Sequence, residues 1–136
     1  MRSLLDTNVL VYADAVDEPA RQRRAIEIIK KHRANGEAVL CTQVLQEYVN
    51  VALRKLGLPA PLIRERLAFY RRFEVATTTP DLIAGALDLH VLHSLSLYDA
   101  LIVQAALASG CQRVLTEDMQ HGASYSGVKI FNPFAD

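Results

Sequence analysis

Four acidic residues stand where a fold could gather them into one site: Asp6, Glu47, Asp99 and Asp118. Two carboxylates about 5 Å apart repel each other by roughly 3 kcal/mol at an effective dielectric constant of about 20. Several such pairs would rival the ~5–15 kcal/mol stability of a domain, so a cluster of this kind requires protons or cations to neutralise it. Carboxylate oxygens suit Mg²⁺ or Mn²⁺. A divalent ion held by them can activate water and stabilise an oxyanion on phosphorus, which is the chemistry of metal-assisted phosphodiester cleavage.

The hydrophobic pattern predicts the elements that would position these acids. Short apolar runs, typical of buried strands, alternate with helical periodicities along the whole chain. We expect strands at residues 3–5, 38–41, 74–77, 112–116 and 128–131, and helices at about 17–35, 43–56, 62–73, 80–93 and 97–109. Asp17 is the predicted cap of the first of these helices, and residues 8–13 fit either period. Apolar strands separated by helices indicate a parallel sheet covered on both faces, which is a three-layer α/β fold.

Two of the acids directly follow predicted strands. Asp6 comes immediately after the first strand, and Asp118 follows the strand that ends at Thr116. If these strands are parallel neighbours, both side chains project at the carboxyl edge of the sheet, where α/β proteins bind their ligands. The alternative interpretation is a turn or capping aspartate, which is common after strands. Taken one residue at a time, the two interpretations are about equally plausible.

The other two acids lie in predicted helices. Glu47 is at the margin of an apolar stripe, and it could instead pair with Arg54 or Lys55 further along the helix. Asp99 shares a helix face with apolar residues, and it also follows Ser96 with the spacing of a capping box. The capping role and a site role are compatible, because an acid at a helix N-terminus can cap the helix and also face a site.

Length and composition limit the class of protein. A chain of 136 residues predicts a single domain, residues 1–136, that needs no disulfide or metal staple. With 51% hydrophobic and 22% charged residues, the chain is neither disordered nor fibrous. The formal net charge of zero neither requires nor excludes a nucleic-acid partner. We expect Cys41 and Cys111 to be buried, reduced thiols, and the protein to be cytoplasmic and not bound to membranes.

Basic residues form two groups on predicted helices. They are Arg21, Arg23, Arg24, Lys30, Lys31 and Arg33 in the first group, and Arg64, Arg66, Arg71 and Arg72 in the second. One hypothesis is a rim that binds phosphates around the acidic centre. The other is an ordinary solvated helix face, which is the more common situation for any single residue.

Four segments resemble the motifs of the PIN-domain family, particularly the VapC-like toxins of bacterial toxin–antitoxin pairs. The segments are Leu5-Asp6-Thr7-Asn8-Val9-Leu10, the Glu47 helix after the second strand, Ser96-Leu97-Tyr98-Asp99-Ala100-Leu101-Ile102 and Leu115-Thr116-Glu117-Asp118. Asp-Thr-Asn alone would be a weak signal. All four segments occur in the family's order and spacing, and the resemblance covers essentially the whole chain.

The resemblance implies a central parallel sheet of four or five strands flanked by helices, and Mg²⁺- or Mn²⁺-dependent endoribonuclease activity on RNA. It also implies an antitoxin partner and a homodimer. The acids that it implies as metal ligands and catalytic residues, acting directly or through water, are Asp6, Glu47, Asp99 and Asp118. Thr7, Asn8 and Thr116 match positions that orient such acids by hydrogen bonding. The additional acid Glu117 is expected to face solvent.

Other classes fit the chain less well. A receiver-type phosphoacceptor domain needs paired acids after its first strand, and a haloacid-dehalogenase-type phosphatase needs Asp-x-Asp there. This chain has Asp6-Thr7-Asn8 at that place. Two alternatives remain within the family: a free-standing RNA-processing nuclease without an antitoxin, and a non-catalytic PIN-fold binding module. Loss of an acid would favour the binding module, and none is lost.

Overall fold

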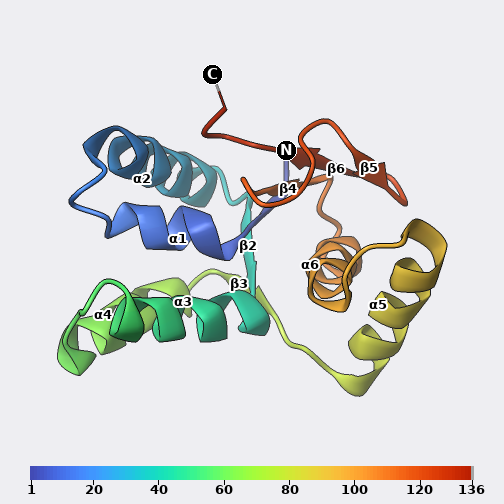
Figure 1. The fold of residues 1–136 in the computed structure, drawn as a ribbon, viewed down its shortest axis with the longest axis horizontal. Helices are drawn as coiled ribbons and strands as arrows, with labels where there is room; N and C mark the ends of the chain where they lie inside the picture. Colours follow the sequence, from blue (N-terminus) through green and yellow to red (C-terminus); the bar gives the residue numbers. More distant parts are fainter. Residues whose placement is uncertain (136) are drawn as a thin grey trace.

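A six-stranded sheet with helices on both faces forms the centre of the computed structural model, which describes residues 1–135 (Figure 1). The strands are β1 (Ser3–Leu5), β2 (Ala38–Cys41), β3 (Glu74–Ala76), β4 (Arg113–Leu115), β5 (Ser124–Tyr125) and β6 (Val128–Phe131). The helices are α1 (Thr7–Ala13), α2 (Pro19–Ala34), α3 (Thr42–Arg54), α4 (Ala60–Tyr70), α5 (Pro80–His93) and α6 (Leu97–Ala108).

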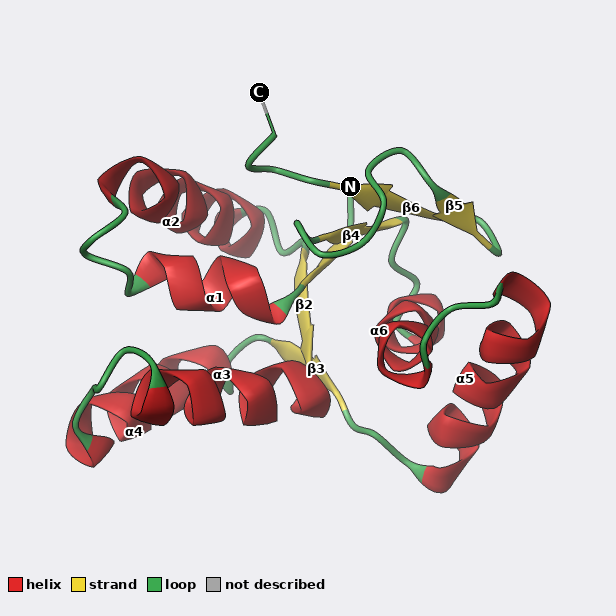
Figure 2. Ribbon diagram, viewed as in Figure 1, coloured by secondary structure: helices red, strands yellow, loops and turns green. Residues whose placement is uncertain are grey.

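The strand order is β3-β2-β1-β4-β6-β5, and every neighbouring pair is parallel except β5–β6. Helices α1 to α4 lie on one side of the sheet, and α5 and α6 lie on the other (Figure 2). The predicted three-layer α/β fold is therefore confirmed. The chain leaves β1 toward β2 on one side and later returns to β4 on its other side. This reversal of strand order occurs at the point where α/β sheets bind ligands.

The central strands are buried on both faces, as their continuous apolar sequences predict. Leu4 and Leu5 of β1 are completely inaccessible to solvent, and so is Leu40 of β2. Both thiols, Cys41 and Cys111, are buried and free, in agreement with the prediction. No single helix within residues 1–135 has the length and apolarity needed to cross a bilayer.

Three local features differ from the sequence prediction or complete it. The ambiguous residues after Asp6 form the helix α1. The predicted cap Asp17 is wrong, because α2 begins at Pro19 and no side chain caps it. Proline at the first helical position has no N–H to be capped, and its φ is already helical.

The short strand β5 was not predicted. Its turn with β6 is Ser126-Gly127, and both residues have positive φ, as a tight hairpin turn requires.

Candidate active site

Asp6 marks the point at which β1 ends and α1 begins. Its backbone N–H donates to the carbonyl of Leu115 in β4 at 3.0 Å. The parallel register pairs Leu5 with Leu115, so Asp6 lies level with Thr116 of the neighbouring strand. As the N-cap of α1, its Oδ1 accepts a hydrogen bond from the Thr7 N–H at 2.7 Å. The carboxylate is thereby held at the carboxyl edge of the sheet.

The charge of Asp6 is poorly solvated. The residue is only 8% exposed, and burial raises the pKa of Asp6 to about 6. Hydrogen bonds from Thr116 and Thr7 oppose this shift, whereas the negative charges of Glu47 and Asp118 add to it. Three of the four predicted acids therefore share one electrostatic environment.

Thr116 and Asn8 connect Asp6 to Asp118. The Thr116 hydroxyl donates to Asp6 Oδ2 at 2.7 Å and accepts from the Asp118 N–H at 3.1 Å. The Asn8 amide donates to Thr116 Oγ1 at 3.3 Å and to Asp118 Oδ2 at 3.1 Å. Because the Thr116 hydroxyl binds three partners and the Asn8 amide binds two, the positions of the two carboxylates depend on each other.

Glu47 joins the same cluster from α3. The Thr7 hydroxyl donates to Glu47 Oε2 at 2.7 Å, one residue after Asp6 in the chain. Gln43, one helical turn before Glu47, donates to its Oε1 at 3.0 Å and also to the carbonyl of Tyr98 at 3.4 Å. Gln43 was not among the predicted site residues, although its spacing of four residues from Glu47 places both on one helix face.

Asp99 lies at the same edge of the sheet, in the first turn of α6. The Gln43–Tyr98 bond brings this turn to the start of α3. The Asp99 N–H donates to Ser96 Oγ at 3.1 Å, which is half of the expected capping box. Its half-buried carboxylate forms no hydrogen bond or ion pair within residues 1–135. The structure therefore links Asp6, Glu47 and Asp118 by hydrogen bonds, and it positions Asp99 nearby without a direct bond to them.

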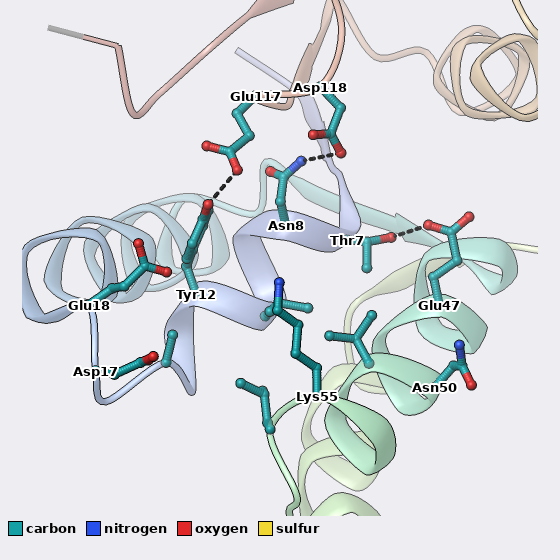
Figure 3. Close-up of a pocket in the computed structure, with 14 residues that line it drawn as sticks. Thr7, Asn8, Tyr12, Asp17, Glu18, Glu47, Asn50, Lys55, Glu117 and Asp118 are labelled. Atoms are coloured by element: carbon teal, nitrogen blue, oxygen red, sulfur yellow. Dashed lines mark hydrogen bonds between the residues drawn. The ribbon is translucent and has the colours of Figure 1, made fainter.

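A groove of about 460 Å³ opens beside the cluster, between α1 and α3 (Figure 3). Thr7, Asn8, Glu47 and Asp118 line it, whereas Asp6 and Asp99 are not among its lining residues. Lys55 extends from the far end of α3 toward α1 (Figure 3). Its volume is in the range of pockets that bind small molecules.

Glu117 does not face solvent, so that expectation is wrong. It is half-buried and accepts hydrogen bonds from the Tyr12 hydroxyl and the Arg21 guanidinium. The guanidinium also lies 5.0 Å from the centre of the Tyr12 ring. Nothing near Glu117 in the sequence identifies these partners, because they come from α1 and α2.

Several members of the predicted basic rim are neutralised by acids. The ion pairs join Arg21 to Glu18 and Glu117, Arg24 to Glu27, and Arg66 to Asp14. These arginines stabilise contacts of the fold and are not free cations around the acidic cluster.

The acidic cluster itself is not balanced by a protein cation from the described part of the chain. Within residues 1–135, none of the four predicted acids forms an ion pair with lysine, arginine or histidine. Across the same residues, no three Asp, Glu, His or Cys side chains converge closely enough to hold a metal ion alone. Mg²⁺ commonly uses one or two carboxylates and keeps several waters. Oxygen ligands around the buried Asp6 charge fit such a partly hydrated ion.

A sequence model of the PIN domain matches residues 3–122. The chain belongs to the PIN-domain family. No curated protein sequence matches it significantly. Solved structures share the PIN fold with it, among them a toxin–antitoxin complex from Klebsiella pneumoniae with a TM-score of 0.69 and 18% identity, covering 97% of this chain and 98% of that one.

Two further solved structures are similar to this PIN domain. The Mycobacterium tuberculosis toxin VapC20, described as cleaving the sarcin–ricin loop, has a TM-score of 0.65 and 22% identity, covering 85% of this chain and 91% of that one. VapBC2 from Rickettsia felis, bound to a DNA fragment from its promoter, has a TM-score of 0.68 and 17% identity, covering 96% and 97%. At these identities the likeness shows the common fold.

Proposed function

We propose that this PIN-domain protein is a Mg²⁺- or Mn²⁺-dependent endoribonuclease that hydrolyses phosphodiester bonds in RNA. Its metal-binding and catalytic acids are Asp6, Glu47, Asp99 and Asp118. The observation that carries the proposal is the cluster of carboxylates without protein cations at the carboxyl edge of the sheet. Such repulsion requires neutralisation by protons or by bound cations, and divalent cations are the neutralising species that the proposed reaction uses.

The residues of the chain hold the acids ready for this chemistry. Thr116 and the Thr7 N–H fix the two oxygens of Asp6, and Asn8 fixes Asp118. The Thr7 hydroxyl does the same for Glu47. A divalent ion bound there would neutralise phosphoryl oxygens and lower the pKa of the attacking water. Positioning the acids before the ion binds reduces the free energy of reorganisation during the reaction.

The biological role that we propose is the toxin of a cytoplasmic toxin–antitoxin pair, with an antitoxin protein as its inhibitor. Solved relatives of the same fold include toxin–antitoxin complexes from Klebsiella and Rickettsia. A free-standing RNA-processing nuclease would have the same acids, and a short inhibitor gene beside the reading frame distinguishes the two roles. A non-catalytic binding module would have no need for hydrogen-bonded, unbalanced acids.

Removal of divalent ions tests the proposed function directly. We expect purified protein to cleave total RNA in 5 mM MgCl₂ or MnCl₂, and to lose this activity by at least about 100-fold in excess EDTA, because the acids act through the ion. Sequencing of the cut ends would identify the target. Cleavage that persists in EDTA after chelator-treated buffers exclude trace metal contradicts a metal-dependent mechanism.

We also propose that the protein is a homodimer formed through α5. The outer face of this helix carries exposed apolar side chains at four-residue spacing, Ile83, Leu87 and Val91, of which Val91 is 75% exposed. Apolar residues in such a row form a continuous stripe along one helix face. A second copy would cover the stripe by packing α5 against α5 about a two-fold axis, because the same patch of each subunit is then buried in the interface.

A charge within the stripe is expected to break this dimer. Leu87→Glu should raise the dimer dissociation constant by at least 10-fold, because an unpaired carboxylate would be buried in the interface. Sedimentation velocity should then show mass shifting toward the 15.1 kDa monomer. Lys31→Glu, an exposed position on α2 across the sheet, is the control and should leave the dimer intact. A wild-type protein that sediments as a monomer at 100 µM contradicts the dimer.

A further inference from the structure

The groove beside the acids continues along α3 to a cation. Glu47, Val51 and Lys55 line it at successive four-residue steps, which places them on one face of the helix. With a rise of about 1.5 Å per residue, Lys55 lies about 12 Å along the helix from Glu47. The backbone positions of Glu47 and Lys55 therefore lie at different places along the groove.

Within residues 1–135, Lys55 is the only basic residue that lines the groove. Five of the lining residues are acidic: Asp17, Glu18, Glu47, Glu117 and Asp118. Lys55 nevertheless forms no ion pair with an acid anywhere in residues 1–135. Its ammonium group is therefore available to an anion that enters the groove from solvent.

The wall between the acids and Lys55 is largely apolar. Val11 of α1 lines it together with Val51 and Leu56 of the α3 region, and Asn50 also belongs to the lining. An apolar surface followed by a cation matches the alternation of base and phosphate in a nucleic-acid strand. An acidic peptide would supply the anion but has no flat apolar group regularly placed between its charges.

We propose that this groove binds the RNA strand next to the scissile phosphate, with Lys55 holding a neighbouring phosphate and a base packed against Val11, Val51 and Leu56. The inference rests on the proposed nuclease function and assigns the path of its substrate. Lys55 is a binding residue and takes no part in the reaction. Cations bound beside Glu47 and Asp118 would reduce the repulsion that the strand meets at that end of the groove.

Arg54 provides a matched control for Lys55. The two residues are adjacent at the end of α3, both are exposed, and neither forms an ion pair within residues 1–135. Only Lys55 lines the groove. Loss of either cation changes the net charge equally, so any difference between Lys55→Ala and Arg54→Ala reports the position of the charge. Melting temperatures of both variants verify that they are folded.

The experiment measures binding of a fluorescein-labelled, 12-nucleotide single-stranded RNA by anisotropy, with Ca²⁺ in place of Mg²⁺ to balance the carboxylates. We expect Lys55→Ala to raise the Kd about 5- to 10-fold and to reduce the slope of log K against log[KCl] by about 0.7, the value for one phosphate contact on a single strand. Arg54→Ala should change the Kd by less than 2-fold. Equal effects of the two substitutions, or no RNA binding by the wild type, would overturn the groove assignment.

Cleavage in Mg²⁺ separates this inference from the proposed function. With an oligonucleotide taken from a mapped cleavage site, Lys55→Ala should raise KM by a similar factor and leave kcat within 2-fold of wild type. If RNA binds with the expected Lys55 dependence but is never cut, the nuclease proposal fails and the groove assignment stands. If RNA is cut and Lys55→Ala behaves like Arg54→Ala, the nuclease stands and the groove assignment fails.

Discussion

Asp6→Asn should reduce RNA cleavage in Mg²⁺ by at least about 100-fold, since even groups that only orient metal ligands contribute 10- to 100-fold. Both oxygens of Asp6 have defined partners, Thr7 and Thr116, and the residue occupies the centre of the cluster. Asparagine keeps the shape but replaces one carboxylate oxygen by an NH₂ group, which cannot bind a cation. Single-turnover cleavage of the mapped RNA site measures the effect, with Asp88→Asn on α5 as a control that should retain wild-type activity.

Asp6→Asn should also change how the free energy of unfolding depends on pH, and the direction of this change follows from the pKa of Asp6. Because burial raises the pKa of folded Asp6 to about 6, against 3.8 for the ordinary side chain, the folded state takes up this proton first as pH falls. Protonation of Asp6 therefore stabilises the folded state. This stabilisation is complete below the unfolded pKa of 3.8 and is lost as pH rises through the folded pKa of about 6. Between pH 7.5 and pH 5, wild type should gain about 1 kcal/mol relative to Asp6→Asn.

Urea unfolding of both proteins in EDTA at these two pH values measures this difference. Comparison with the variant cancels other titrating groups, such as the buried His32, whose pKa is lowered mainly by burial. A free-energy difference that does not change with pH would mean that Asp6 is well solvated in solution. In that event, burial of Asp6 would give no reason to expect a bound cation beside it.

The sequence was most informative where the chain carries local, periodic signals. Runs such as Ser3-Leu4-Leu5 predict a buried strand, and their alternation with helices predicts the layers. Asp6 and Thr116 could be placed at one edge because each follows a strand, and parallel strands end together. For the ambiguous residues of α1, the short run fits two periods, and only packing against α2 and α3 selects the helix.

Contacts between segments that are far apart in the chain could not be predicted from the sequence. Glu117 looks like an ordinary turn acid, and only the fold brings Arg21 and Tyr12 to it. Gln43 is similar, since its bond to Tyr98 depends on how α6 crosses the start of α3. The spacing of polar residues predicts which helix face they share, but the partner across the interface depends on the angle and register of two packed elements.

Asp99 is the one predicted acid whose carboxylate has no hydrogen bond within residues 1–135. Its substitution therefore distinguishes a catalytic role of this residue from a purely structural one. We expect Asp99→Asn to lower cleavage by at least about 100-fold, as Asp6→Asn does, because the proposed site needs charge from α6 as well as from β1. Stability should fall by less than about 1 kcal/mol, which is the effect of one carboxylate in the first turn of a helix.

Asp81 is the matched control for this experiment, because it occupies the first turn of α5 as Asp99 occupies the first turn of α6. Asp81→Asn should cost a similar amount of stability and leave cleavage unchanged, so that a purely structural role of Asp99 would make the two variants alike in the single-turnover assay. If both retain wild-type cleavage, α6 contributes no charge to the reaction. The catalytic centre would then consist of the linked acids Asp6, Glu47 and Asp118 alone.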